Sequence, residues 1–489
     1  MTRPTPSPFR GDDRLLFGII FGVLAFWLFA QTTLNVSPTM ASDLQIENSL
    51  MNIAVSITAL FSGIFIVVFG GLADRLGRVR VLVWGFLLSA AGSILVAVAP
   101  QGALAIPLLM LGRILQGLSA ACIMPASLAL VKAYWDGAAR QRAVSLWSMG
   151  SWGGSGFAAL FGGIVAENLG WRYIFMGSAL LSLVGLMMVR GTPESKAATD
   201  REYRFDTKGM LTFTVAMLAL QIVTTQGSAI GWIHPVTLVL TVIFLAAAAL
   251  FFRIESTARN PFIDFKLFRN PTFSGATLSN LLLNGVAGML IVSMLLLQIG
   301  GQLSAQQAGM LTLGYAIAII AFIRVGEKLL KRFGARKPMI WGSLIVGLSI
   351  ALLMPTNMML GQYKLLAVIS YTLFGLGLAF YATPSTDAAL SNLPDDQAGS
   401  GSGIYKMASS LGASFGVAIS AAIFTVLSGN DQPIPWIDGL ITFAGRQDNV
   451  GVRQAAMISL GFNLLMVAAA IIAIVKTVPE ERGPENVKP

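Results

Sequence analysis

Long apolar stretches alternate with short polar ones along almost the whole chain. A helix of about 20 apolar residues crosses the hydrocarbon core of a membrane, and most of these stretches approach that length. Lipid offers the backbone no hydrogen-bond partner, so such a stretch is expected to be helical. We therefore predict an all-α integral membrane protein with 14 transmembrane helices. The candidate spans begin near Leu15, Met51, Val81, Ala105, Ala143, Tyr173, Gly209, Val236, Ser274, Gln307, Pro338, Leu365, Gly403 and Ala455.

The polar segments between the runs differ in charge. Of the 33 Lys and Arg residues, 26 fall in every second segment and near the two chain ends, whereas Arg172, Lys364, Arg446 and Arg453 fall in the other segments. Lys and Arg near span ends favour the cytoplasmic side. With an even number of spans, both termini are predicted on the cytoplasmic side of the cell membrane.

The composition supports a membrane location for most of the chain. Hydrophobic residues make up 55% of the 489 residues, charged residues only 11%, and the mean hydropathy is +0.73. A soluble protein carries far more charge. The net charge of +10 would suit a nucleic acid, but a nucleic-acid surface is concentrated on one domain. The charge here follows membrane topology, so the expected partner is the lipid bilayer and not nucleic acid.

The residue counts exclude several classes of chemistry. The single cysteine, Cys122, lies in an apolar stretch, and the single histidine, His234, lies in a predicted outer loop. No disulfide framework, metal site or histidine acid–base chemistry is therefore expected. The pattern G-x-x-x-x-G-K-[ST] does not occur, which argues against direct use of ATP. We predict that the protein is not an enzyme and needs no cofactor. The first apolar run is too long for a signal peptide and is expected to remain as a span.

Three weak matches at nearly one offset indicate an internal repeat. Gly334 follows Gly77 by 257 positions, Pro384 follows Pro125 by 259, and the Ser and Gly pattern of residues 151–155 recurs at 410–414. Such residues also recur by chance in membrane helices, but the shared offset favours duplication, which is typical of secondary transporters. We predict an N-terminal six-helix half over residues 1–190, a two-helix insertion with cytoplasmic loops over 191–273, a C-terminal six-helix half over 274–477 and a cytoplasmic tail over 478–489.

The polar segment between the second and third spans combines glycines, an acid and arginines, namely Gly70, Asp74, Arg75, Gly77 and Arg78. In a turn this short, the carboxylate can pair with an arginine and with a helix N-terminus, whose positive dipole end favours an anion. Such a contact can form in one conformation and break in another, which suits a gate. The alternative is that these charges only set the topology.

The corresponding segment of the second half is residues 324–337. It has Lys331 at the position of Asp74. The gate is therefore predicted to have its acid in the first half only.

The motif Gly70-x-x-x-Asp74-Arg75-x-Gly77-Arg78 resembles the cytoplasmic signature of the major facilitator superfamily. Residues 111–117, with Arg113, resemble the fourth-span motif of that superfamily, whose arginine the resemblance links to proton coupling. Fourteen spans in a 6+2+6 plan resemble its drug:proton antiporter branch. Blocks at residues 26–31, 52–63, 148–156, 280–288 and 381–387 are similar to the Nor-type multidrug efflux pumps.

The resemblance implies the major facilitator fold and proton-coupled efflux of amphipathic compounds such as quinolones by alternating access. The chain departs from the antiporter pattern at two places. The acid usual in the first span is replaced by Ala30, although Thr32 and Asn35 fit the pattern. The fifth-span motif has Ala158 and Ala159 and lacks its proline.

Four ionisable residues are candidates for proton coupling. Asp387 lies inside an apolar span, where an ionisable group is costly unless it is paired or faces water. Lys406 could pair with it, for coupling or as a structural pair. Glu47, before the second span, is either a proton site at the outer mouth or a helix-start carboxylate favoured by the dipole. Arg113 stays charged in the bilayer, and either acts on a neighbouring acid or clamps helices through hydrogen bonds.

Aromatic, methionine and amide residues in the first, fifth, ninth and twelfth spans are candidates for a substrate cavity. Ring faces and thioethers accept varied apolar cations, and amides add hydrogen bonds without charge. Packing or lipid contact is the alternative for most of them. The set is Trp27, Gln31, Asn35, Trp147, Trp152, Asn280, Asn284, Met289, Gln298 and Tyr381.

The main functional hypothesis is a multidrug exporter that takes small amphipathic drug-like substrates from the cytoplasm or inner leaflet, with protons as the coupling ion. The alternative within transport is an exporter or facilitator of a native metabolite or lipid-like precursor. The alternative of another class is a membrane sensor or scaffold without flux, which predicts a large soluble domain that the short loops do not supply. We expect the protein to be a monomer.

Overall fold

The computed structural model describes residues 9–30, 32–196, 206–258, 261, 263, 265–303, 305–428, 433–435 and 441–480. The regular structure in these residues is helical. The candidate Gln31 lies outside the described residues, and the side chain of Asn35 is not described either. The predicted all-α class is confirmed.

The first group of helices, which we call the N-terminal bundle, ends at Val189. Its first span joins α1, a π-helical segment η1 and α2, and its fifth span joins α6, the π-helical η2 and α7. π-Helical segments are rare and frequent at functional sites. The elements are α1 Asp13–Leu24, η1 Ala25–Ala30, α2 Thr33–Leu44, α3 Asn48–Leu76, α4 Arg78–Ala97, α5 Ala105–Tyr134, α6 Gly137–Ser148, η2 Met149–Gly153, α7 Gly154–Asn168 and α8 Arg172–Val189.

A helical hairpin of α9 (Thr207–Ile230) and α10 (Pro235–Thr257) precedes the C-terminal bundle. The ninth span of the chain again contains a π-helical segment, η4. The remaining elements are η3 Phe265–Arg269, α11 Pro271–Gly285, α12 Gly288–Leu295, η4 Leu296–Gly300, α13 Ala305–Met310, α14 Leu313–Phe333, α15 Arg336–Leu353, α16 Leu360–Ser391, η5 Asp395–Gln397, α17 Ala398–Ser428 and α18 Val450–Thr477.

The helices follow the predicted spans in order and are consistent with the predicted number. Thirteen stretches of the described chain are helical, long and apolar enough to cross a membrane. The other predicted span, near Ala143, corresponds to α6, η2 and α7. Several helices begin before the predicted start, as α17 does at Ala398 instead of Gly403 and α18 at Val450 instead of Ala455. Polar residues continue these helices beyond the hydrocarbon core, so apolar runs underestimate their length.

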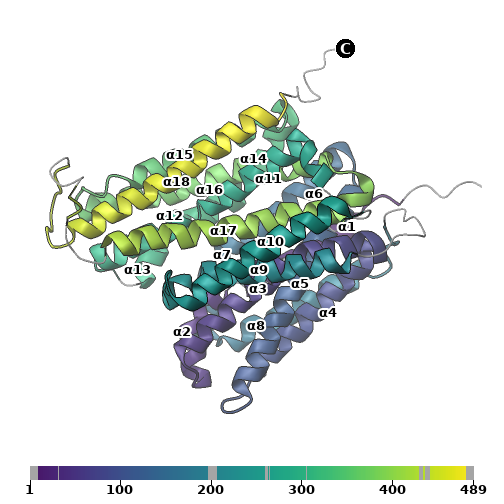
Figure 1. The fold of residues 1–489 in the computed structure, drawn as a ribbon, viewed down its shortest axis with the longest axis horizontal. Coiled ribbons are helices and arrows are strands. Elements are labelled where there is room, and N and C mark those ends of the chain that lie inside the picture. Colours follow the sequence, from purple (N-terminus) through teal and green to yellow (C-terminus); the bar gives the residue numbers. More distant parts are fainter. Residues whose placement is uncertain are drawn as a thin grey trace, which may run out of the picture.

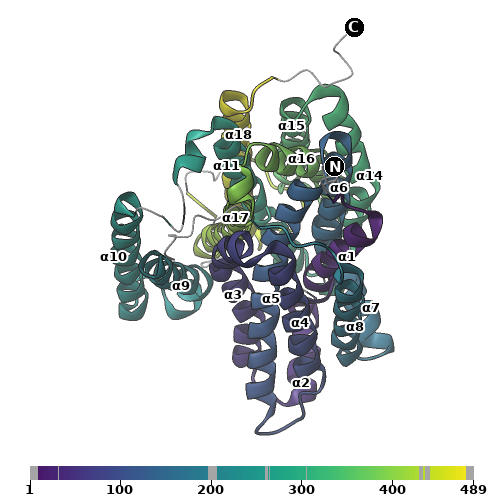
Figure 2. The same cartoon turned by 90° about the vertical axis from the view of Figure 1, so that its right-hand side faces the viewer.

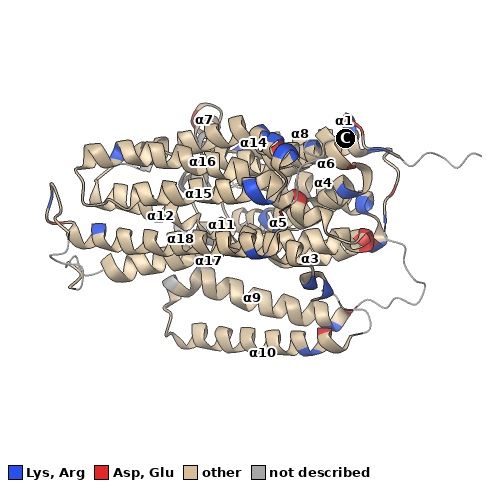
Figure 3. Cartoon of the chain, turned by 90° about the horizontal axis from the view of Figure 1, so that it is seen from above, with Lys and Arg blue, Asp and Glu red and all other residues tan. Residues whose placement is uncertain are grey.

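The two bundles converge at one end of the molecule and diverge toward the other (Figure 1). Most of the Lys, Arg, Asp and Glu residues gather at the end where they converge (Figure 3), which we call the charged end; the opposite end is the far end. Helices α3 and α17 pack against each other across the junction of the bundles.

The hairpin of α9 and α10 lies beside the two bundles (Figure 2). Helix α9 contacts both α3 and α17, so it covers the seam between the bundles. Helix α10 packs on α9, and most of its surface is exposed. Only 11% of the residues in its most apolar stretch are buried. In a membrane this exposed apolar surface faces lipid.

Equivalent close contacts recur in the two bundles. A Cβ on Gly117 of α5 would overlap the carbonyl of Thr58 in α3, and a Cβ on Gly375 of α16 would overlap the carbonyl of Tyr315 in α14. Small residues allow membrane helices to approach this closely. The recurrence supports the internal repeat, while the residue boundaries of the predicted halves stay predictions.

Candidate functional site

The Asp74 carboxylate joins the two bundles at the charged end. Asp74 is 4% exposed and lies within α3, which continues to Leu76, so the prediction that it lies in a turn is wrong. The backbone N–H groups of Gly399 and Ser400, in the first turn of α17, donate to its two oxygens over 2.8 and 2.9 Å. First-turn N–H groups have no partner within their helix and carry partial positive charge. The carboxylate satisfies two of them across the junction.

Arg78 holds the same carboxylate from the N-terminal bundle. Its Nε and Nη2 lie 3.1 and 2.9 Å from Asp74 Oδ1. Nη2 also donates to the carbonyl of Asp395 in the opposite bundle, 2.6 Å away. We call the Asp74–Arg78 pair and its contacts to the start of α17 the latch.

Glycines make this approach possible. A Cβ on Gly70 would overlap the carbonyl of Gly399, and a Cβ on Gly399 would overlap that of Gly70. Gly77 is the single residue between α3 and α4, and its φ of +120° favours glycine. Arg75, the remaining predicted gate residue, is half-buried near the end of α3. The predicted segment therefore acts through a one-residue break between two helices.

A second ion pair joins the bundles near the latch. Arg140 Nε of α6 lies 3.3 Å from Asp387 Oδ1 of α16, and its Nη2 donates to Ser391 Oγ over 2.8 Å. Asp387 is 6% exposed. Lys132 adds a contact of 3.4 Å to the exposed side chain of Asp395. Two buried acids that the sequence singled out, Asp74 and Asp387, thus both contact the opposite bundle.

The segment after α8 covers the latch. The Glu194 carboxylate accepts hydrogen bonds from the N–H groups of Val79 and Arg80, over 2.9 and 3.0 Å, at the start of α4. Ser195 Oγ accepts from Arg78 Nη1 over 3.1 Å. Glu194 therefore caps α4 with a charge that a helix N-terminus favours, and its neighbour holds the latch arginine.

Glu194→Ala is expected to weaken the latch from outside it. The change leaves two N–H groups of α4 without their partner, which costs about 1 kcal/mol. We expect the unfolding temperature in detergent to fall by about 2 °C and substrate efflux to fall about fivefold. Glu167→Ala, at an exposed position near the end of α7, is the control and is expected to change neither. Unchanged efflux in Glu194→Ala would show that this segment does not support the latch.

The structure corrects the prediction of an acid in the first half only. Glu327 of α14 is 2% exposed and lies 2.5 Å from Arg324 and 2.7 Å from Lys331. It precedes Lys331 by one helical turn, so a position-by-position comparison with Asp74 misses it. Both bundles therefore carry a buried acid at the charged end, and the ion pairs of Glu327 are with its own helix.

The sequence around Arg140, Glu194 and Ser195 does not indicate that these residues belong to a site. Arg140 reads as one of several basic loop residues, and Glu194 as a loop acid after Pro193. Their partners lie 247 and 115 residues away along the chain. Only the fold brings these groups to the latch.

Arg113 is the centre of a polar cluster inside the N-terminal bundle. It is 1% exposed, and its Nε and Nη1 donate over 3.0 Å to the carbonyls of Ala54 and Ala30. Nη1 also donates to Gln116 Oε1 over 2.6 Å. Ala30 ends the π-helical segment η1, where the altered backbone bonding leaves its carbonyl available. The position where the family resemblance expects an acid thus supplies a backbone oxygen to Arg113.

Lys406 and Glu47 differ from their predicted contacts. Lys406 Nζ lies 4.8 Å from the ring centre of Trp147 and 5.9 Å from that of Trp27, whereas Asp387 pairs with Arg140. The predicted pairing of Lys406 with Asp387 is therefore wrong in this conformation, because Lys406 faces the opposite bundle. Glu47 is exposed at the N-cap position of α3, and its side chain does not cap the helix. Its role in proton coupling stays a prediction.

Comparison with known proteins agrees with this geometry. The family model of the Major Facilitator Superfamily matches residues 15–417 and, a second time, residues 276–489. This chain belongs to the major facilitator superfamily. It is 43% identical over 482 residues to the quinolone resistance protein NorB of Staphylococcus aureus strain MRSA252, which covers 98% of this chain and 99% of NorB. NorB of strain COL matches with the same identity and coverage.

Solved structures share the fold of this major facilitator. The proton:xylose symporter XylE, bound to 6-bromo-6-deoxy-D-glucose, has a TM-score of 0.65 at 16% identity and covers 96% of each chain. The human organic anion transporter MFSD10 has a TM-score of 0.59 at 13% identity, covering 94% of this chain and 98% of its own. At these identities the similarity shows the fold alone. The predicted all-α major facilitator fold and the family are confirmed, and the 14-span 6+2+6 plan stays a prediction with which the helices are consistent.

Four of the predicted substrate residues of this major facilitator are core residues in the observed conformation. Trp147, Asn280, Met289 and Tyr381 are at most 1% exposed. The polar ones are hydrogen-bonded: Trp147 Nε1 donates to Ser127 Oγ over 2.9 Å, Asn280 Nδ2 to the Tyr405 carbonyl over 2.9 Å, and the Tyr381 hydroxyl contacts Ser279 Oγ over 2.7 Å. These contacts fit the packing alternative.

Four other candidates are partly exposed, namely Trp27, Trp152, Asn284 and Gln298. Trp27, Trp152 and Gln298 lie in the three π-helical segments η1, η2 and η4, respectively. The apolar pattern carries no signal for such segments. Since π-helical segments are frequent at functional sites, these three residues remain the strongest candidates for ligand contact.

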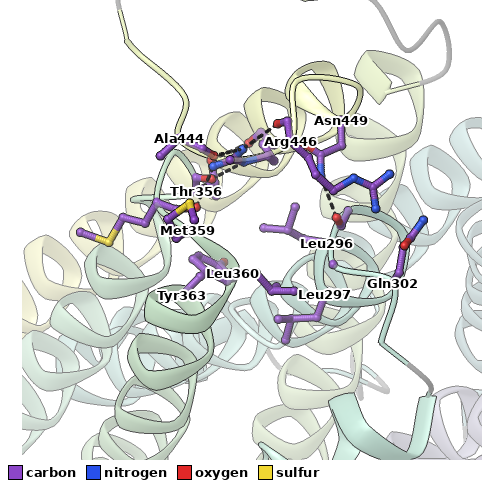
Figure 4. A pocket seen from close by; sticks show the side chains of 15 residues that line it. Leu296, Leu297, Gln302, Thr356, Met359, Leu360, Tyr363, Ala444, Arg446 and Asn449 are labelled. Atoms are coloured by element: carbon purple, nitrogen blue, oxygen red, sulfur yellow. Dashed lines mark hydrogen bonds between the residues drawn. The ribbon is translucent and has the colours of Figure 1, made fainter.

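The far end of the C-terminal bundle contains a pocket of about 300 Å³ that the sequence did not predict (Figure 4). Its floor is apolar, and polar groups of two loops and of η4 border it. The residues shown around it include Leu296, Leu297, Gln302, Thr356, Met359, Leu360, Tyr363, Ala444, Arg446 and Asn449. None of the predicted substrate residues whose side chains the structure describes lines it.

The two arginines that line this pocket form their polar contacts with neighbouring residues of the protein. Arg453 donates to the carbonyls of Thr356 and Met358 over 2.5 and 2.8 Å, which ties α18 to the loop before α16. Arg446 forms an ion pair with the exposed Asp448, and its hydrogen bond lowers the pKa of that carboxyl. The pocket therefore offers mainly an apolar surface.

Proposed function

We propose that this protein is a proton-coupled exporter of amphipathic drug-like compounds, quinolones among them, in the cell membrane. The observation that carries the proposal is the 43% identity, over 98% of the chain, to the quinolone resistance protein NorB. Membership of the major facilitator superfamily and the two-bundle fold support transport by alternating access.

We assign the charged end to the cytoplasm. Basic residues such as Arg78, Lys132 and Arg140 gather there, and such residues favour the cytoplasmic side. Both termini then lie in the cytoplasm. In this assignment the structure is an outward-open conformation whose cytoplasmic side is closed by the latch.

Substrate enters between the bundles from the cytoplasm or the inner leaflet while the latch is open. Closure of the latch and separation of the bundles at the far end release it outside. Because one chain contains both bundles, the monomer is a complete transport unit. Protons are the coupling ion, and no other cofactor is needed.

Asp387 links the proton to the gate in this scheme. Its ion pair with Arg140 holds the bundles together at the charged end. A proton on Asp387 removes the charge that attracts Arg140, and the same carboxylate is then a weaker partner. Proton uptake therefore favours opening toward the cytoplasm, which resets the carrier for the next substrate.

Quinolone accumulation in cells that express the protein tests the proposed function. We expect less drug inside these cells than in cells with an empty vector, and a protonophore is expected to abolish the difference. Equal accumulation with and without the protein would overturn drug export. A difference that persists in the protonophore would overturn proton coupling.

Asp387→Asn is expected to uncouple export from the proton gradient, because the amide keeps the size of the side chain but cannot take up the proton. Substrate added to the purified wild type is expected to release protons, and this release is expected to be lost in the variant. Asp136→Asn changes an exposed acid directly before α6, at the same end, and is the matched control with unchanged release. Normal proton release in Asp387→Asn would place the coupling site at another residue.

A further inference from the structure

Lys406 is a buried cation to which the described part of the chain offers no carboxylate within ion-pair distance. The residue is 5% exposed, and the contacts of its ammonium are with the ring faces of Trp147 and Trp27. Burying an ammonium is costly unless an anion and hydrogen bonds compensate it. Ring faces return part of this cost, roughly 0.5 to 2 kcal/mol. A counter-ion that is present only during part of the transport cycle would explain why the charge is kept here.

Trp27, whose ring lies beside Lys406, has a second buried donor that lacks an acceptor. The Nε1 atom of Trp27 is buried and has no hydrogen-bond partner among the described residues. A buried indole N–H normally finds an acceptor. Lys406 Nζ, 5.9 Å from the centre of that ring, and this N–H are both pure donors. Both donors lack an acceptor, and an acceptor with negative charge would also compensate the charge of Lys406.

A carboxylate supplies both the negative charge and the acceptors that these two donors lack. Its two oxygens accept hydrogen bonds from separate donors, and charge-assisted bonds are about twice as strong as neutral ones. The adjoining ring faces suit a planar aromatic group, which prefers offset or edge-on packing against tryptophan. A ligand with a carboxylate on an aromatic system would therefore use all the groups present.

The three residues lie at the junction of the two bundles. Lys406 belongs to α17 of the C-terminal bundle, and Trp27 and Trp147 belong to η1 and α6 of the N-terminal bundle. Their contact spans the junction, so it loosens when the bundles begin to separate at the charged end, and a carboxylate can then enter between the two donors. Trp27 is partly exposed. In the observed conformation the rings cover the ammonium, and opening of the latch uncovers it.

We propose that Lys406 and the indole N–H of Trp27 form a subsite for the carboxylate of an exported aromatic amphiphile. This inference rests on the proposed export function and narrows its substrates to aromatic acids, zwitterions included. Lipophilic cations without a carboxylate meet the like charge of Lys406 and bind less tightly.

Binding of a fluoroquinolone and of its methyl ester to the full-length protein in nanodiscs tests the subsite. The ester keeps the aromatic system and removes the anionic charge. We expect the wild type to bind the acid about tenfold more tightly than the ester, as one desolvated charge-assisted bond provides. In Lys406→Met this ratio is expected to fall to about one, because ester binding stays near the wild-type value while acid binding weakens.

Two further variants keep the test decisive if Lys406→Met folds poorly. Lys406→Arg retains the charge and is expected to retain the preference for the acid. Trp27→Phe retains the ring, removes the N–H and is expected to lower the ratio about threefold. Equal binding of acid and ester by the wild type, or an unchanged ratio in Lys406→Met and Trp27→Phe, would overturn the subsite and leave export itself intact. Failure of the wild type to bind either compound would overturn both the subsite and the proposed export of quinolones.

Discussion

Asp74→Asn is expected to open the charged end of the molecule and to lower efflux at least about tenfold. The carboxylate accepts hydrogen bonds from two N–H groups of α17 and from Arg78. The amide keeps one acceptor oxygen and turns an NH₂ group toward donors, and it removes the charge that pairs with Arg78. Losing charge-assisted bonds of this kind costs about 2 to 3 kcal/mol. That loss shifts the balance between closed and open latch by roughly 30- to 150-fold.

Distances between spin labels at the charged end measure this shift. Ala138 at the start of α6 and Lys328 in α14 are exposed positions on opposite bundles, and Cys122 is the single native cysteine to be removed. We expect a longer distance to dominate in Asp74→Asn. Asp13→Asn breaks an exposed ion pair with Arg142 within one bundle and is expected to keep the wild-type distance. If Asp74→Asn keeps both that distance and full efflux, the latch is not a gate.

Arg113→Lys is expected to abolish gradient-driven efflux while the protein still binds substrate. The lysine keeps the charge but loses the planar set of donors that reaches Ala30, Ala54 and Gln116. Losing one of these hydrogen bonds to a charged group costs about 1.5 to 3 kcal/mol. We expect this loss to appear as missing substrate-induced proton release, since the cluster joins the first, second and fourth spans.

Arg453→Lys is the matched control for Arg113→Lys. Arg453 is also buried and also donates to backbone carbonyls, but it ties a loop at the far end. The variant Arg453→Lys is expected to lower the unfolding temperature and to leave the number of protons released per substrate unchanged. If Arg113→Lys behaves in the same way, Arg113 is a structural clamp and takes no part in coupling.

The fold could be predicted from the sequence because each span is marked by its own run of apolar residues. Runs of apolar residues depend on neighbouring residues and on the membrane, so the order and the helical nature of the spans could be predicted from them. The ends of the helices did not follow, since polar residues continue α17 and α18 beyond the lipid core. The pair of Asp74 and Arg78 was predictable because the two residues are one turn apart on the chain.

The rest of the candidate site was not predictable for a physical reason. Arg140 meets Asp387, and Lys406 meets Trp27 and Trp147, across the junction of two bundles, where the partners are set by the fold and by the conformational state. The π-helical segments that carry Trp27 and Trp152 change the direction of side chains without a change in apolar pattern. Long-range contacts of this kind can be identified only from the three-dimensional structure.

Transport by the purified protein in sealed vesicles tests the central claim, which is proton-coupled export by alternating access. A quinolone is offered to the cytoplasmic face, with the vesicle lumen about one pH unit more acidic, a difference worth about 1.4 kcal/mol per proton. We expect the wild type to concentrate the drug in the lumen, up to about tenfold for a one-proton exchange. We expect the drug to leave when the gradient is collapsed, and we expect Asp74→Asn not to concentrate it. Equal drug concentrations on both sides with the gradient in place would contradict proton-coupled export.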